Sequence, residues 1–189
     1  MATAIRQMMS PSATAFATRL PLRPQVRAQL IELLNRRLAD MVDLQLQAKH
    51  AHWNVRGRSF LPLHELFERI AAEAAAHADL LAERAVQLGG LAEGLLPTLV
   101  ERSELGRHRP PLAGEADYLT SLADALAALS ERLRQGVIES EALSDAPSED
   151  ILTEISRAVE KLLWQVEAHA PVKAGGDGDG MEAMRAAPS

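Results

Sequence analysis

Four long segments of this 189-residue chain carry apolar residues at helical spacing, at about residues 23–53, 59–88, 114–142 and 148–170. Leu and Ala dominate the apolar residues and aromatic residues make up only 3%, a bias that favours helices over β-sheets. The connection at about residues 91–112 is long enough to be a crossover and to hold a short helix near 97–105. We therefore predict an all-α protein whose four long helices form a bundle.

Turn residues mark the ends of these helices. Gly57 lies in the break at 54–59, and Gly89-Gly90 ends the second helix in the manner of a C-cap. Ser59 and Ser148 are predicted N-cap residues of the second and fourth long helices. One long connection between the second and third helices is typical of a ferritin-like four-helix bundle.

The two ends of the chain differ from the predicted bundle at residues 24–170. Residues 1–23 hold arginines, several prolines and no acidic residue, and we predict a flexible basic arm. Their Ser, Thr and Ala content leaves an organelle transit peptide as the alternative. Residues 171–189 are rich in Gly, Asp and Ala, and we predict a flexible tail.

Composition excludes several classes of protein. The chain has no cysteine, so any metal must be held by His, Asp and Glu, a donor set suited to iron, manganese or zinc. No run of about 18 apolar residues predicts a membrane span, and no secretory signal peptide is evident. We expect a cytoplasmic protein, although its net charge of −6 opposes long-range attraction to DNA.

Two pairs of metal-binding residue types lie on the second predicted helix. His64 with Glu68, and Asp79 with Glu83, are each spaced i, i+4 and therefore share a helix face. The two pairs face the same way but lie about 16 Å apart along the axis. One metal ion can reach both pairs only if a second copy of the helix packs antiparallel across a twofold axis. Each dimer would then carry two sites.

The residues between the pairs fit such a dimer. Residues 71–76 are all alanine except Glu73, and small side chains allow two helix backbones to approach closely. The alternative is that these alanines serve only as strong helix formers. His52, near the end of the first helix, brings the set of candidate ligands to five, and two imidazoles with three carboxylates suit iron in either oxidation state.

Three stretches of the sequence carry a resemblance to a known family: KHAHWNVRG at 49–57, LHELFE at 63–68 and HADLLAERAVQLGG at 77–90. They resemble the Dps family, the DNA-binding proteins from starved cells, and the similarity runs from about residue 34 to 167. Family members are twelve-subunit hollow shells that oxidise Fe(II), preferably with hydrogen peroxide, and store the ferric mineral inside.

The resemblance implies roles for individual residues. The expected ferroxidase ligands, shared between subunits, are His52, His64, Glu68, Asp79 and Glu83. Trp53 matches a tryptophan near that centre which takes up oxidising equivalents in relatives. The family usually has Asp where this chain has Glu68, and the extra methylene can shift or weaken the iron site.

Two further groups have an alternative assignment. Asp145, Glu149 and Asp150 lie where relatives build an acidic pore for iron entry, but acids at a helix N-terminus also complement the helix dipole. A DNA-binding arm would use the cations Arg6, Arg19, Arg23 and Arg27. The leading hypothesis is an iron-oxidising storage shell that protects DNA. The alternatives are a nucleoid-associated, DNA-compacting protein with a secondary metal centre, and a purely structural helical oligomer.

Overall fold

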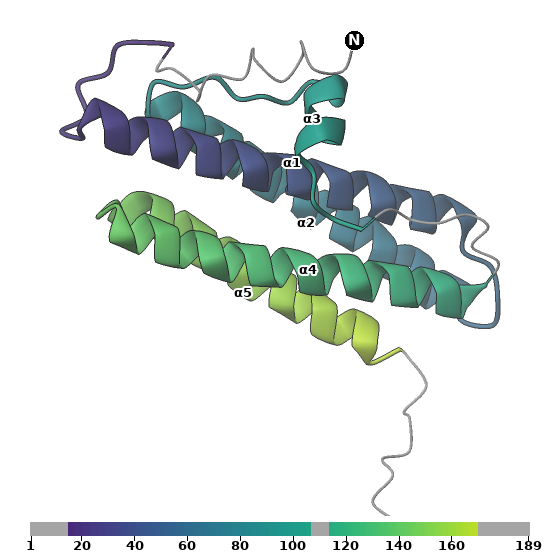
Figure 1. Ribbon diagram of the computed structural model, residues 1–189. Coiled ribbons are helices and arrows are strands. Elements are labelled where there is room, and N and C mark those ends of the chain that lie inside the picture. The colour runs from purple at the N-terminus through teal and green to yellow at the C-terminus, as the bar shows by residue number, and fades with distance from the viewer. Residues whose placement is uncertain (1–14, 107–113, 170–189) are drawn as a thin grey trace, which may run out of the picture.

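The computed structural model describes residues 15–106 and 114–169, and within them all regular structure is helical. The five helices are α1 Pro24–Asn54, α2 Phe60–Gln87, α3 Leu96–Arg102, α4 Glu115–Ala142 and α5 Ala146–Glu167. Figure 1 shows α1 paired with α2 and α4 paired with α5, each pair joined by a short turn. The two hairpins pack against each other, and the predicted four-helix bundle of the ferritin-like type is confirmed. None of the helices described is long and apolar enough to cross a membrane.

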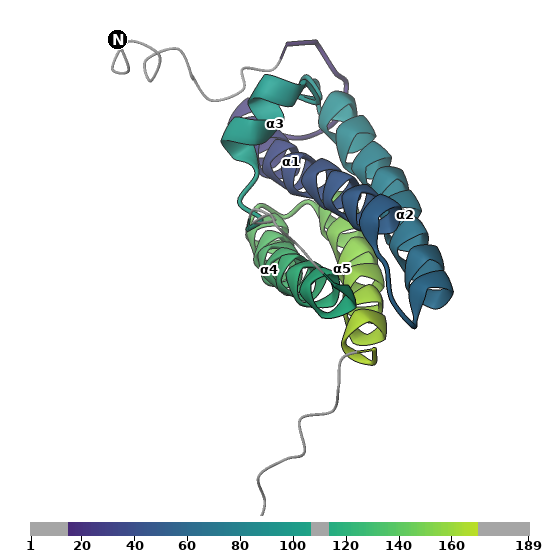
Figure 2. The same cartoon turned by 90° about the vertical axis from the view of Figure 1, so that its right-hand side faces the viewer.

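The core lies between the four long helices, where each of them buries a stripe of Leu, Ile, Val and Ala. α3 stands outside this core, across α1 on the side away from α5, as the end-on view in Figure 2 shows. The predicted helix bounds agree with the observed ones to within a few residues, including the short helix in the crossover.

The C-terminal end of α2 has the predicted glycine cap. Gly89 adopts φ +88°, and the amides of Gly89 and Gly90 donate to the carbonyls of Val86 and Ala85. This is the Schellman pattern, which satisfies carbonyls that the helix end would otherwise leave free. Phe16 donates its amide to the Gly89 carbonyl at 2.9 Å, so the described part of the predicted arm is held to the end of α2 at this residue.

Of the two predicted serine caps, the position of Ser59 is confirmed and that of Ser148 is wrong. Ser59 occupies the N-cap position of α2, without a side-chain cap hydrogen bond, and its amide donates to Glu115 Oε1 at 2.6 Å. Asp145, not Ser148, occupies the N-cap position of α5. Ser148 is buried within the first turn, where its hydroxyl accepts a hydrogen bond from Arg84 Nε at 3.0 Å.

Polar side chains of α1 hold the crossover in place. The buried amide of Asn35 donates to the Leu91 carbonyl and accepts from the Glu93 amide, both at 2.9 Å. Further along α1, Asp40 is fully buried, and its Oδ1 accepts from the Glu104 amide at 2.9 Å. The buried backbone of this irregular segment thus finds partners on the helix beneath it.

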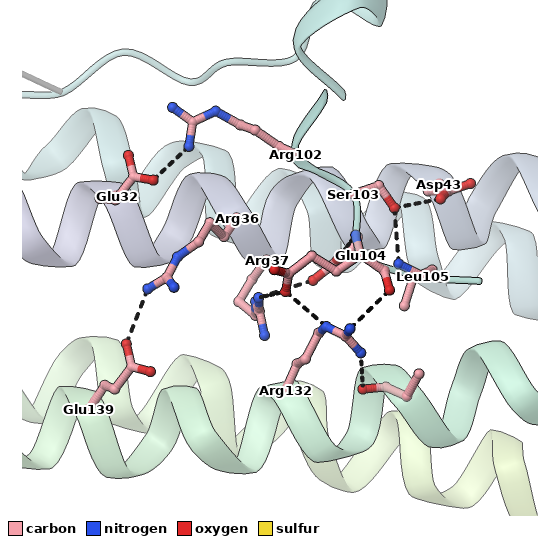
Figure 3. A network of polar contacts seen from close by, with 12 residues as sticks. Glu32, Arg36, Arg37, Asp43, Arg102, Ser103, Glu104, Leu105, Arg132 and Glu139 are labelled. Carbon is pink, nitrogen blue, oxygen red and sulfur yellow. Dashed lines mark hydrogen bonds and ion pairs between the residues drawn. The ribbon is translucent and has the colours of Figure 1, made fainter. Parts of the chain in front are cut away.

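The same network reaches α4 (Figure 3). Glu104 Oε2 lies 3.5 Å from Arg37 of α1 and 3.0 Å from Nε of Arg132 on α4. Arg132 also donates to the Glu104 carbonyl at 2.9 Å. At the end of α3, Arg102 pairs with Glu32 of α1 at 2.8 Å. Ion pairs therefore tie α1, the crossover and α4 together outside the apolar core.

Candidate metal centre

The turn between α1 and α2 brings two histidines into contact. α1 ends at Asn54, and Gly57 turns the chain with φ +150°, a conformation in which a side chain would meet Glu115. α2 then begins at Phe60, so His52 and His64 lie opposite each other. Their imidazole rings stack with centroids 3.7 Å apart and planes inclined by 23°.

Each histidine is oriented by the backbone of the other. His52 Nδ1 lies 2.9 Å from the His64 carbonyl, and His64 Nδ1 lies 2.8 Å from the His52 carbonyl. A carbonyl oxygen can only accept a hydrogen bond, so the Nδ1 atom of each histidine must be the protonated donor. The neutral rings then keep a lone pair on Nε2, which is the arrangement of metal-binding histidines.

Glu68 lies one helical turn after His64 and approaches the same rings. Its Oε2 is 3.4 Å from His52 Nε2 and 2.6 Å from the Lys49 ammonium. The hydrogen bond from Lys49 holds the pKa of Glu68 below its usual range, helped by the charge of the Lys49 ammonium. An ionised carboxylate therefore lies beside the His52 imidazole nitrogen that can bind a metal.

The second pair of predicted ligands lies elsewhere on α2. Asp79 and Glu83 are exposed; Asp79 lies about 16 Å further along the helix axis than Glu68, and Glu83 lies one turn beyond it. Within the two described stretches of one protomer, no three His, Asp or Glu side chains are grouped closely enough to hold a metal. A straight helix cannot bring its own two pairs together, so one protomer does not assemble all five predicted ligands.

The two pairs are joined by an exposed stripe on α2. It runs at helical spacing through Glu68, Ala72, Ala76, Asp79 and Glu83, all of which are exposed. Ala71, Ala74 and Ala78 are instead buried in the protomer's own core. Part of the alanine-rich stretch therefore packs the bundle, and part leaves a smooth surface between the carboxylates.

Exposed aromatic and apolar side chains surround the histidines. Trp53 is 67% exposed, and Phe60 and Leu61 are also exposed. The Phe60 ring lies 5.1 Å from that of His64, while the Lys49 ammonium lies 5.9 Å from the Trp53 ring centroid. Lys49 was not among the residues predicted for the site, although its position three residues before His52 places it on the same helix face.

The predicted pore residues have different surroundings. Asp145 is buried, and both of its carboxylate oxygens accept from Arg84 Nη2, at 3.1 and 2.8 Å. Its charge is therefore balanced within the protomer. Glu149 is half-buried and Asp150 exposed, and only these two present carboxylates toward the surface.

The predicted DNA-binding cations are also separated by the structure. Arg6 lies outside the described residues, while Arg19 and Arg23 are exposed on the segment before α1. Arg27 lies inside α1 and donates to the Leu88 carbonyl at 3.3 Å, so it helps to hold the end of α2. In the described part of the predicted arm, only Arg19 and Arg23 are exposed cations.

Comparisons with known proteins agree with the fold and the motifs. A ferritin-like domain family matches residues 31–171. A DNA protection during starvation protein of Agrobacterium fabrum is 33% identical over 156 residues, covering 82% of this chain and 96% of the relative. The protein of the same name from Brevibacillus brevis is 30% identical, covering 78% of this chain and 98% of its own.

Solved structures give the same result. DpsA14 from Streptomyces coelicolor superimposes with a TM-score of 0.79 at 31% identity, covering 84% of this chain and 94% of its own. Dps from Microbacterium arborescens in its high iron form gives a TM-score of 0.74 at 30% identity, covering 81% of this chain and 98% of its own. With its fold, its motifs and these relatives in agreement, the chain belongs to the Dps family of ferritin-like proteins.

Proposed function

We propose that this protein oxidises Fe(II) with hydrogen peroxide at centres shared between two subunits, and stores the ferric product inside a hollow dodecameric shell. The removal of free Fe(II) and peroxide would protect DNA from oxidative damage. The observation that carries the proposal is the His52–His64 pair, because the reciprocal hydrogen bonds leave both Nε2 atoms free to bind a metal and the Nε2 of His52 lies 3.4 Å from Glu68.

The remaining ligands would come from a second subunit. If two copies of α2 pack antiparallel about a twofold axis, the exposed stripe of one copy lies on that of the other. His64 and Glu68 of one subunit then meet Asp79 and Glu83 of its partner. Ala72 and Ala76, at the middle of the stripe, would let the two helices approach closely.

The proposed ligand set suits the reaction. Neutral imidazoles bind Fe(II), and the three carboxylates add negative charge that favours the Fe(III) product. Two Fe(II) ions give one electron each to a peroxide, whose O–O bond breaks to yield two hydroxides or, with two protons, two waters. Delivery of both electrons together avoids the release of a hydroxyl radical. Trp53, exposed beside the centre, would take up any stray oxidising equivalent.

The proposal includes an iron-entry route, and a second candidate function stands beside it. Glu149 and Asp150 would draw Fe(II) toward the shell electrostatically, whereas Asp145 is already paired with Arg84. The second candidate function, DNA compaction in the nucleoid, is favoured by the names of the relatives and by the exposed Arg19 and Arg23.

The test of the function is anaerobic loading of the purified oligomer with Fe(II), followed by peroxide, beside a His52→Ala/Asp79→Ala variant. We expect rapid oxidation with the iron retained in solution, lost in the variant. Equally slow oxidation and precipitation in both proteins would contradict the ferroxidase proposal and favour DNA compaction. Removal of residues 1–22 tests DNA compaction. If the N-terminal arm binds DNA, its removal should abolish DNA retardation at low salt.

A further inference from the structure

The Lys49 ammonium is bound to the Glu68 oxygen that lies beside His52. Lys49 Nζ lies 2.6 Å from Glu68 Oε2, the same oxygen that lies 3.4 Å from His52 Nε2. The pair is only partly exposed, with 30% of the Lys49 side chain and 48% of the Glu68 side chain accessible. A carboxylate oxygen that faces an imidazole lone pair is thus already bound to a cation.

The helical positions of Lys49 explain this contact. It precedes His52 by three residues and Trp53 by four, so all three share one face of α1. The face points toward the first turns of α2, where His64 and Glu68 lie. The longer side chain of Glu, compared with the Asp usual in this position, extends the carboxylate toward the ammonium. The ammonium also lies 5.9 Å from the Trp53 ring, within the range of a cation–π contact.

We propose that Lys49 is a positioning residue that holds the metal-binding position of Glu68 until Fe(II) arrives and must leave it for the metal to bind. The inference rests on the proposed ferroxidase centre. An ammonium donates hydrogen bonds but has no lone pair, so it cannot join the ligands of a metal. A divalent ion at Oε2 would instead repel it. Lys49 therefore holds the carboxylate beside the histidines at the cost of a weaker affinity for the metal.

The test uses Zn²⁺, which binds the same donor types without redox chemistry. Binding to the assembled protein is measured by calorimetry for the wild type and Lys49→Met, and the centre is identified as the binding lost in His64→Ala. We expect Lys49→Met to bind Zn²⁺ about two- to fivefold more tightly, the range that corresponds to breaking a partly exposed ion pair. Lys49→Gln, which removes the charge but keeps a polar side chain, should behave like Lys49→Met.

Lys161→Met is the matched control, since it removes the same charge from an exposed position on α5. It should bind Zn²⁺ as the wild type does. A second readout is fluorescence of Trp53 in a Trp164→Phe background. Zn²⁺ should change it in the wild type, because the ammonium leaves the ring, and should change it much less in Lys49→Met.

The outcomes separate the inference from the function on which it rests. Equal or weaker binding in Lys49→Met, with binding at the centre retained in the wild type, would overturn the role of Lys49 and leave the centre intact. No His64-dependent Zn²⁺ binding in any of these proteins would overturn both.

Discussion

The Asp40 carboxylate is fully buried in α1 and lies 3.2 Å from the Arg37 guanidinium, which is also buried. Burial raises the pKa of Asp40, although the Glu104 amide and Arg37 act in the opposite direction. Burial likewise lowers the pKa of Arg37, which Asp40 partly offsets. Each of these two residues therefore depends on the other to remain charged away from water.

Removal of one partner should be far more costly than removal of an exposed pair. We expect Arg37→Met to lower the free energy of unfolding by about 3–5 kcal/mol, because it leaves a buried carboxylate without its cation. Arg36→Met is the matched control, since Arg36 pairs with Glu139 at a half-exposed position (Figure 3) and should cost about 1 kcal/mol or less. Chemical denaturation at equal protein concentration measures both, and equal losses would contradict this account.

The loss of stability in Arg37→Met should depend on pH in a defined direction. The folded-state pKa of Asp40 lies above its unfolded value, so as pH rises from below about 4 the unfolded chain loses its proton first. The contribution of Asp40 to stability is therefore greatest in acid and falls as pH rises through the raised pKa. Without Arg37 the pKa rises further, so Arg37→Met should be more destabilising at pH 7 than at pH 4. The opposite order would exclude an uncompensated Asp40 as the cause.

Spacing was sufficient to predict that His64 and Glu68 share one face of α2, because residues four apart lie one helical turn from each other. It was not sufficient to predict the partners of single side chains. Lys49 of α1 contacts Glu68 of α2, and the buried Asp145 pairs with Arg84, which lies 61 positions away in the chain. Such contacts depend on how the helices are placed in three dimensions.

At the scale of the helices, the end of α2 depends on one glycine. Gly89 has φ +88°, and a side chain there would also meet the Phe16 carbonyl that crosses it. We expect Gly89→Ala to cost about 1–3 kcal/mol and to release residues 15–23 from the body. Gly94→Ala is the control, because no atom lies within 4 Å of the position its new methyl group would take.

Limited proteolysis before α1, together with thermal unfolding, measures this prediction. Cleavage at residues 15–23 should be faster in Gly89→Ala than in the wild type or Gly94→Ala. Equal cleavage in all three would show that the contact of Phe16 with Gly89 does not hold the segment.

The helix bounds were predicted well because apolar period, glycine and proline are local properties of the chain. The Ser148 cap was predicted wrongly, because Asp145 occupies the N-cap position and the Ser148 hydroxyl bonds to Arg84 of α2. Arg84 belongs to a helix distant in the sequence, so the local pattern gave no sign of this contact.

At the scale of the whole molecule, the exposed stripe on α2 is the proposed contact between subunits. Its centre requires small side chains if two helices are to approach closely. We expect Ala76→Trp to shift the oligomer to smaller species and to reduce Fe(II) oxidation, while the helical content of each subunit stays the same. Ala76→Ser keeps the side chain small and should assemble normally. Sedimentation velocity and circular dichroism measure these outcomes, and normal assembly of Ala76→Trp would place the interface elsewhere.

The central claim, that one metal centre takes ligands from two subunits, is tested most directly by mixing two inactive variants. His64→Ala and Asp79→Ala subunits are unfolded together, refolded in equal amounts, and assayed for Fe(II) oxidation by peroxide. With random pairing across a twofold axis, half of the dimers are mixed and each holds one intact centre of two, so about a quarter of wild-type activity should return. If the mixture stays as inactive as the two variants refolded separately, the shared centre is contradicted.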